Sequence, residues 1–309
     1  MEKRINFFDG SEFFGAIGME NIRTPLYDKP CNPNPVNGYH VLSTKPFFAK
    51  EHNKGKRFSL QDFELKTAEL SALCWRRYNG PIYLITDTEG EAYFKNKGLE
   101  YVYDGILPLL ENINHGINPV KYWASGKIEA LKMLKTPCAI IDLDLIVWKP
   151  LELHNSKLTV AHIEHLADFV YPPFSYFNMS KRYLFPTEWD RNVEPFNTAF
   201  NYIADEELKE YYVKEAIRFM QFERDTVDDG VKCMVFAEQR ILGMCAQARG
   251  INAETLIDYD NIDAPQNYIT HIWSAKPLLF IEKELRSEYI DLCTRKIEAF
   301  KKQGVKNAV

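Results

Sequence analysis

The sequence of 309 residues lacks a hydrophobic run long enough to cross a membrane, which needs about 20 consecutive apolar residues. It also lacks an excess of basic residues, because 38 lysines and arginines stand against 43 aspartates and glutamates and the net charge is -5. Nucleic-acid-binding proteins usually cluster cations against the phosphate backbone, and no such cluster is present. We therefore expect no nucleic-acid partner and no transmembrane segment.

The cysteines form no C-x-x-C pair and lie far apart in the chain. They are Cys31, Cys74, Cys138, Cys233, Cys245 and Cys293. Most have apolar neighbours, so reduced, buried thiols are favoured over metal ligands or disulfides. Residues 1–9 carry cations but no apolar core of signal-peptide length, and the expected location is the cytoplasm.

Residues 39–150 alternate between short apolar strands and amphipathic helices. Strands are expected at 39–43, 82–86, 99–103 and from 139. Helices are expected at 60–78, with Ser59 as the N-cap, and at 121–135. This βαβαβ order predicts an α/β class, with a mostly parallel central sheet and helices on both faces. Such sheets bind ligands at the carboxyl ends of their strands, where this chain carries Ser43, Asp87, Asp104, Asp142 and Asp144.

The pattern changes beyond Pro150. A strand is expected over 158–162, and helices over 205–222 and 237–249. Residues 167–196 form a long irregular segment with nine aromatic residues in 30 positions, which indicates either a satellite core or a binding loop. Residues 277–302 have helical spacing, and a helix packed on the body is favoured over a peripheral helix on a membrane surface.

Two aspartates, Asp142 and Asp144, lie two positions apart in the apolar run 139–148. In an extended chain these positions point to one face, and two carboxylates there raise each other's pKa unless a positive group lies between them. A divalent cation meets this need, since oxygen ligands suit Mg²⁺ and Mn²⁺, which keep open positions for substrate phosphates. The alternative is that both are ordinary loop aspartates, one of them a helix cap. Their position at a strand end favours the metal site.

The strand, the D-x-D pair and the following residues 149–151 (KPL) resemble the nucleotide-sugar domain of type-A-fold (GT-A) glycosyltransferases. Three later segments are similar to the glycogenin and lipooligosaccharide galactosyltransferase group, which retains the anomeric configuration. Residues 196–200 (FNTAF) resemble its F-N-[AST]-G stretch, with Ala199 for glycine. Residues 237–242 (AEQRIL) resemble its D-Q-D-x-L stretch, with Glu238 for aspartate. Residues 271–277 (HIWSAKP) resemble its H-x-x-G-x-x-K-P-W stretch, one residue shorter, with Ser274 for glycine and no final tryptophan.

The resemblance spans roughly residues 39–277. It implies a GT-A-like fold and a metal-dependent glycosyltransferase, of the kind found in polysaccharide biosynthesis. Such an enzyme would move a sugar from a UDP-linked donor to a glycan or other hydroxyl acceptor with retention. Asp142, Asp144 and His271 would bind Mn²⁺ or Mg²⁺, and imidazole suits Mn²⁺ better. Lys276 would contact the diphosphate, and Lys127 the donor.

Further residues complete the predicted site. Asn197 and Gln239 would line the donor sugar and the reacting face, with Glu238 beside them, and the strand-end residues Ser43 and Asp87 join the donor-binding set. In the aromatic segment, Trp189 with Asp190 or Glu188 is the candidate acceptor site.

The expected organisation has four parts. These are an irregular lead-in (1–38), a nucleotide-sugar-binding half ending in D-x-D (39–150), the acceptor and metal-completing half of the same domain (151–280) and a C-terminal amphipathic helix (281–309).

Structural interpretations stay open for each later motif. His271 could be a buried core histidine, Asn197 a turn residue, and the lysines and the pair 238–239 surface groups. A nucleotidyltransferase could share the sheet, although no glycine-rich phosphate loop follows the first strand near Ser43. A glycosidase with paired carboxylates or a non-catalytic carbohydrate-binding relic of the fold would also be compatible with parts of the pattern. An inverting transferase would need a general base, and its candidates are Glu238, Asp190 and Asp228.

Overall fold

The computed structural model describes residues 32–112, 116–224, 229–259 and 268–306. Most of the predicted lead-in, Cys31 and Asp228 lie outside these ranges. The proposed division of the chain into parts remains a prediction.

A seven-stranded sheet runs through the molecule in the order β3-β2-β1-β4-β7-β6-β8. Its strands are β1 (Gly38–Leu42), β2 (Ile82–Thr86), β3 (Gly105–Leu107), β4 (Cys138–Ile141), β6 (Leu158–Ile163), β7 (Phe196–Ile203) and β8 (Glu254–Thr255). Strand β7 is antiparallel to both of its neighbours, and the other pairings are parallel. A small second sheet pairs β5 (Leu145–Val147) antiparallel with β9 (Ile269–His271).

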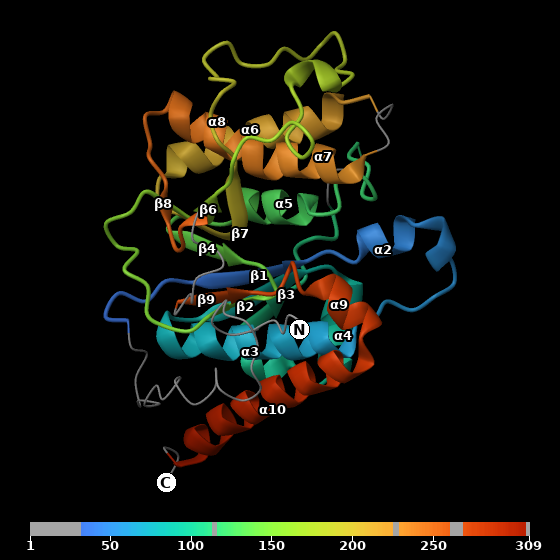
Figure 1. The fold of residues 1–309 in the computed structure, drawn as a ribbon, viewed down its shortest axis with the longest axis vertical. Coiled ribbons are helices and arrows are strands. Elements are labelled where there is room, and N and C mark those ends of the chain that lie inside the picture. The colour runs from blue at the N-terminus through green and yellow to red at the C-terminus, as the bar shows by residue number, and fades with distance from the viewer. Residues whose placement is uncertain (1–31, 113–115, 225–228, 260–267, 307–309) are drawn as a thin grey trace, which may run out of the picture.

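Helices cover both faces of the central sheet (Figure 1). One layer contains α5 (Ser125–Met133), α6 (Glu206–Phe222), α7 (Gly230–Val235) and α8 (Ile241–Ala248). The other layer contains α3 (Asp62–Tyr78), α4 (Thr88–Asn96), α9 (Lys276–Ile281) and the long α10 (Lys283–Lys306). The short α2 (Lys45–Ala49) and the 3-10 helix η1 (Glu51–Asn53) follow β1. The predicted α/β class with a mostly parallel sheet between two helical layers is therefore confirmed.

Most predicted elements are present, and two details are wrong. The strand expected at 99–103 is the 3-10 helix η2 (Glu100–Val102), and β3 begins only at Gly105. Asp104 therefore precedes its strand, and its carboxylate accepts the backbone N–H of Ile82 at 2.9 Å instead of facing a ligand. Helix α3 is not capped by Ser59, because Gln61 and Glu64 form a capping box at its start.

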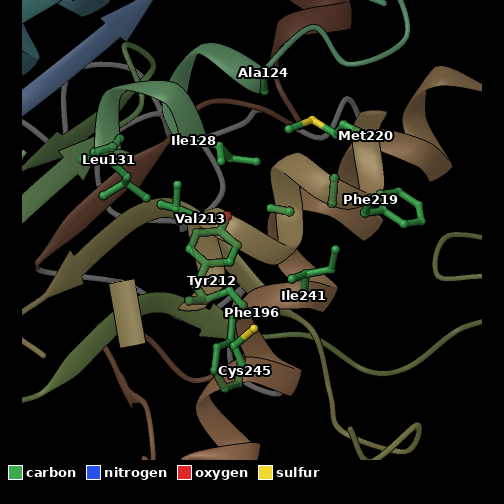
Figure 2. Close-up of a cluster of buried hydrophobic side chains, with 14 of the residues drawn as sticks. Ala124, Ile128, Leu131, Phe196, Tyr212, Val213, Phe219, Met220, Ile241 and Cys245 are labelled. Atoms are coloured by element: carbon green, nitrogen blue, oxygen red, sulfur yellow. The ribbon is translucent and has the colours of Figure 1, made fainter. Parts of the chain in front are cut away.

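The larger hydrophobic core lies between the sheet and the layer of α5 to α8. Figure 2 shows Ile128 and Leu131 of α5 in one cluster with Tyr212 and Phe219 of α6 and Ile241 of α8. Close packing of this kind leaves side chains few alternative arrangements, so it fixes the positions of the helices that carry polar groups toward the sheet.

The irregular aromatic segment packs on the same helices. Phe177, Tyr183 and Trp189 are buried in the larger core, so the satellite-core interpretation holds for them. Trp189 is 5% exposed and its indole N–H donates to the hydroxyl of Tyr211 at 3.0 Å, so it has no free face for a sugar. Gly243 permits α8 to lie close to the irregular segment, because a Cβ at this position would lie 2.9 Å from the carbonyl oxygen of Glu194.

The C-terminal helix α10 packs against α3, on the face of the sheet opposite the larger core, as predicted for residues 277–302. Its buried face, which includes Tyr289 and Leu292, joins a cluster with Phe63 and Leu70 of α3. None of the helices in the described ranges is both long and apolar enough to span a bilayer. The five cysteines within those ranges are free and buried, while the cytoplasmic location remains a prediction.

Strand β1 carries a buried histidine whose protonation opposes folding. The ring nitrogens of His40 lie 2.9 Å from the hydroxyl of Tyr103 and 3.0 Å from that of Ser71. Burial lowers the pKa of His40 to about 3, although the negative charge of Asp144 acts in the opposite direction. The unfolded chain therefore binds one more proton than the folded chain between about pH 3 and 6.5.

We predict that this residue makes the protein acid-sensitive. Stability from His40 is present above pH 6.5 and is lost as the pH falls, by at most about 1.4 kcal/mol per pH unit. Urea unfolding between pH 4 and 7 should show a shallower pH slope in His40→Gln than in the wild type. His154→Gln, at an exposed histidine, should keep the wild-type slope, and equal slopes in all three proteins would contradict the prediction.

Candidate functional site

The two aspartates of the D-x-D pair lie where β4 ends and the chain turns into the second sheet. The backbone N–H of Asp142 donates to the carbonyl of Ala199 on β7 at 2.8 Å, which holds the aspartate beside that strand. The next turn is closed by a hydrogen bond from the N–H of Leu145 to the carbonyl of Asp142 at 3.0 Å. The carboxylates of Asp142 and Asp144 are thereby held close together.

Strand β9 brings a histidine to the same place. Leu145 is the register partner of His271, and the N–H of Ile272 donates to the carbonyl of Asp144 at 3.1 Å. As a result, one ligand atom each of Asp142, Asp144 and His271 lie within 4.8 Å of one another. Nε2 of His271 is 3.6 Å from Oδ1 of Asp144. Residues far apart in sequence thus form the three-residue cluster that the motifs predicted.

Two lysines hold the two aspartates. Nζ of Lys127, on α5, lies 2.5 Å from Oδ1 of Asp142, and Nζ of Lys276, at the start of α9, lies 3.0 Å from Oδ2 of Asp144. Each lysine engages one oxygen of its aspartate, so the other oxygen can serve as a metal ligand. The ammonium groups also reduce the repulsion between two carboxylates that share a buried site.

The electrostatic environments of the two aspartates differ. Burial raises the pKa of Asp142 to about 6, because the nearby Asp144 and Glu238 carboxylates add to desolvation and outweigh Lys127. Burial acts in the same direction on Asp144, but His271 and Lys276 hold its pKa well below the usual range. The charges of Asp142 and Glu238 keep the pKa of Lys127 raised despite its burial. The site therefore carries an excess of negative charge that a divalent cation would offset.

A pocket of about 440 Å³ opens beside this cluster. Its lining includes the charged groups of Asp142, Asp144, Lys127 and Lys276. It also includes the aromatic rings of Phe47, Phe58 and Trp123. Trp123 is 48% exposed, which is unusual for a tryptophan. A pocket lined by both aromatic rings and charged groups suits a ligand with a ring system and an anionic group.

The predicted donor-binding residues occupy different environments. Ser43 lines the pocket, but Asp87 does not appear among its lining residues and has a structural role. Its carboxylate accepts hydrogen bonds from the N–H of Thr44 at 2.7 Å and from the N–H of Gly90 at 3.0 Å, where it caps α4. Asp87 thus fixes the loop after β1, which carries Ser43.

The other predicted catalytic residues belong to a second cluster of polar side chains. Glu238 and Gln239 lie in a π-helical turn, η4 (Phe236–Arg240), a geometry that is frequent at functional sites. Oε1 of Glu238 lies 2.7 Å from Nζ of Lys127, so the π-turn is coupled to Asp142. This arrangement rules out the interpretation of Glu238 as part of a solvated helix face, because Glu238 is buried.

Gln239 and Asn197 belong to one hydrogen-bond network. The amide of Asn197 donates to Oε1 of Glu164 at 2.7 Å, and the hydroxyl of Tyr171 lies 2.5 Å from both Oε2 of Glu164 and the amide oxygen of Gln239. A phenol has one proton, so the network is satisfied when Tyr171 donates to Glu164 and the Gln239 amide is turned to donate to Tyr171.

Several site residues were not predicted from the sequence. Glu164 and Tyr171 belong to or flank the irregular aromatic segment, and nothing in their spacing marks them. Glu64, which lines the pocket and lies 3.9 Å from Lys276, was assigned only to a helix. The exposed Trp123 could have been noted as an aromatic residue four positions before Lys127, in the turn that leads into α5.

Comparisons with known proteins identify a family but no curated relative. A family model described as a family of unknown function (DUF6734) matches residues 48–302. No curated protein matches the sequence.

Solved structures with a similar architecture have low sequence identity. The glycosyltransferase GlyE of Streptococcus pneumoniae TIGR4 is 14% identical, with a TM-score of 0.46, over 88% of this chain and 64% of that one. Its apo form is 12% identical, with a TM-score of 0.34, over 66% and 42%. The inositol-1-phosphate CTP transferase of T. maritima is 14% identical, with a TM-score of 0.40, over 84% and 97%. The chain thus spans less than two thirds of either GlyE structure.

We predict that the partly buried Lys127 stabilises the fold by neutralising the carboxylates of Asp142 and Glu238. Lys127→Met should lower the free energy of unfolding by about 3 kcal/mol, because it leaves uncompensated buried charges. The double variant Lys127→Met, Glu238→Gln should recover part of this loss. Urea denaturation measures both effects.

The matched control is Lys132→Met, an exposed lysine on the same helix. It should change the free energy of unfolding by less than about 0.5 kcal/mol. A similar loss in Lys127→Met and Lys132→Met would show that the buried ion pairs contribute nothing.

Proposed function

Because this chain belongs to the DUF6734 family, whose function is unknown, we propose its activity from the site itself. It is a divalent-cation-dependent glycosyltransferase that moves a sugar from a nucleoside-diphosphate sugar, most simply a UDP-sugar, to a hydroxyl acceptor. The observation that carries this proposal is the meeting of Asp142, Asp144 and His271 beside the pocket, which the two aspartates line.

The donor set fits a divalent cation. Two ligands on one ion lie at most about 4.2 Å apart at a bond length of about 2.1 Å, so the three ligand atoms need to close only slightly from their spread of 4.8 Å. Asp142, Asp144 and His271 would hold the ion, and the imidazole favours Mn²⁺ over Mg²⁺. When bound, such an ion supplies positive charge that stabilises the negative charge developing on a departing diphosphate.

The surrounding residues supply the remaining requirements. Lys276 is beside Asp144, where its ammonium can contact a phosphate without leaving the aspartate. Phe47, Phe58 and Trp123 offer apolar faces for a nucleobase. A lining that combines aromatic rings with cationic groups matches a nucleoside diphosphate better than a bare glycan. This favours a transferase over a glycosidase.

Retention of configuration is the stereochemistry that the site supports. An inverting transfer needs a general base for the acceptor hydroxyl. Among the candidate bases, Glu238 is buried and held by Lys127, and Asp190 is exposed and does not line the pocket, while Asp228 lies outside the described residues. Gln239 has an amide that cannot take a proton at neutral pH. Asn197, Glu164, Tyr171 and Gln239 form a rigid network that can orient a sugar, and orientation supplies a large part of the barrier reduction.

We predict that UDP and a divalent cation bind cooperatively. The melting temperature should rise by several degrees with UDP and Mn²⁺ together, because ligand at 100 times its Kd adds about 2.7 kcal/mol to the free energy of unfolding. UDP alone should have little effect. Asp144→Asn and His271→Gln should fold but lose the joint shift, since they remove ligands without creating a core cavity.

The control is Asp291→Asn, at an exposed aspartate on α10, which should keep the full shift. The product released during turnover distinguishes a glycosyltransferase from a nucleotidyltransferase. A glycosyltransferase releases UDP from a UDP-sugar, whereas a nucleotidyltransferase releases pyrophosphate from a nucleoside triphosphate. The proposal is wrong if UDP stabilises the protein equally without a metal, or if the two variants respond like the wild type.

A further inference from the structure

His162, on β6, has a buried side chain that makes none of the contacts described above. It is 2% exposed, and neither ring nitrogen has a hydrogen-bond partner among the described residues. Its ring packs against that of Tyr259, with the centroids 5.2 Å apart and the planes inclined by 33°, which satisfies neither nitrogen. Buried polar atoms are nearly always hydrogen-bonded, so two unpaired nitrogens on one ring call for a partner.

The pairing of β6 with β7 brings His162 opposite a site residue. The register shifts by two residues between Val160, which pairs with Asn201, and His162, which pairs with Asn197. The two extra residues are on β7, so His162 keeps the face that it shares with Val160 on β6. Bulges of this kind are common beside active sites. The irregularity therefore gives His162 a different partner on β7, because a regular register would pair it with Ala199.

The ring of His162 lies beside the hydrogen-bond network of the candidate site. Asn197 is the register partner of His162, so their side chains share a face of the sheet, and Asn197 donates to Glu164. Glu164 in turn contacts Tyr171, which contacts Gln239. His162 thus lies on the same face of the sheet as the network that holds Gln239.

The chemical state of the ring defines the partner it can take. Burial lowers the pKa of His162, an effect that outweighs the opposite influence of the Glu164 charge. A neutral imidazole has one N–H donor and one nitrogen acceptor. A sugar hydroxyl, which also donates and accepts, is its complement, whereas a phosphate offers only acceptors.

We propose that His162 is a substrate-binding residue that hydrogen-bonds a hydroxyl group of the sugar being transferred. This inference rests on the proposed function, since it takes Asn197 and Gln239 to line that sugar. It predicts that His162 discriminates between a nucleotide that carries a sugar and one that does not. The diphosphate and the nucleoside bind in the pocket beside Lys276 and Trp123 and should not depend on His162.

The test compares UDP with UDP-sugars in the presence of Mn²⁺. Calorimetric titration with UDP, UDP-glucose, UDP-galactose and UDP-N-acetylglucosamine gives, for each protein, the ratio of the best UDP-sugar Kd to the UDP Kd. His162→Phe removes both nitrogens and keeps an aromatic ring. It should leave the UDP Kd unchanged and raise the ratio about tenfold, the effect of one or two lost hydrogen bonds.

Two conservative variants give a readout that a purely structural role would not move. His162→Asn and His162→Gln keep a donor and an acceptor, at the positions of Nδ1 and Nε2 respectively. One of them should restore the ratio toward the wild-type value and so identify the nitrogen that contacts the sugar. Thr159→Val is the matched control, because it removes a buried polar group from the same strand and should keep the wild-type ratio.

The outcomes separate this inference from the proposed function. Failure of wild-type protein to bind UDP with Mn²⁺ would overturn the proposed function and this inference together. Normal binding of UDP by His162→Phe, with an unchanged sugar ratio, would overturn only the role of His162. In that case the ring would hold an internal water, and the substitution would alter stability alone. Should His162→Phe fail to fold, the Asn and Gln variants decide, since unchanged ratios in both would also overturn the role.

Discussion

The pairing of two aspartates with two lysines is the constraint on which the rest of this structure depends. Asp142 and Asp144 lie too close together to stay charged in a buried site without compensation. Lys127 reaches Asp142 from α5, the helix before β4, and Lys276 reaches Asp144 from the start of α9. Each ammonium group contacts one carboxylate oxygen. The remaining oxygens and the imidazole of His271 are then held together without a cation. The same contacts connect the end of β4 to α5 and α9.

Around this centre, different elements of the fold supply the pocket and the histidine of the cluster. The carboxyl ends of β1 and β4 form the pocket, and the small β5–β9 sheet adds the histidine from a distant part of the sequence. The π-turn of η4 links the site to the core shown in Figure 2, because Glu238 reaches Lys127 while Phe236 is buried among aromatic rings. A rigid core behind a polar site keeps its groups in place, which is how a protein lowers the cost of reorganisation during a reaction.

The sequence predicted those features that depend on short-range patterns. The run 82–86 is strand β2 with the same bounds, and the spacing of Asp142 and Asp144 placed both at a strand end. Features that depend on tertiary context were missed. Asp87 was expected at the donor because it follows a strand, and its role as the cap of α4 was not foreseen. The pairing of His162 with Asn197 depends on a register shift, and the roles of Glu164 and Tyr171 depend on how a long irregular segment folds back on η4. Neither the register shift nor the path of the irregular segment can be predicted from a local periodicity of the sequence.

The most direct test of the central claim is anomalous X-ray diffraction from crystals grown with Mn²⁺ and UDP. We expect one strong manganese peak within bonding distance, about 2.2 Å, of Asp142, Asp144 and His271, with the diphosphate of UDP completing the coordination shell. A manganese peak elsewhere, or UDP bound in the pocket with no metal between these three side chains, would contradict the account.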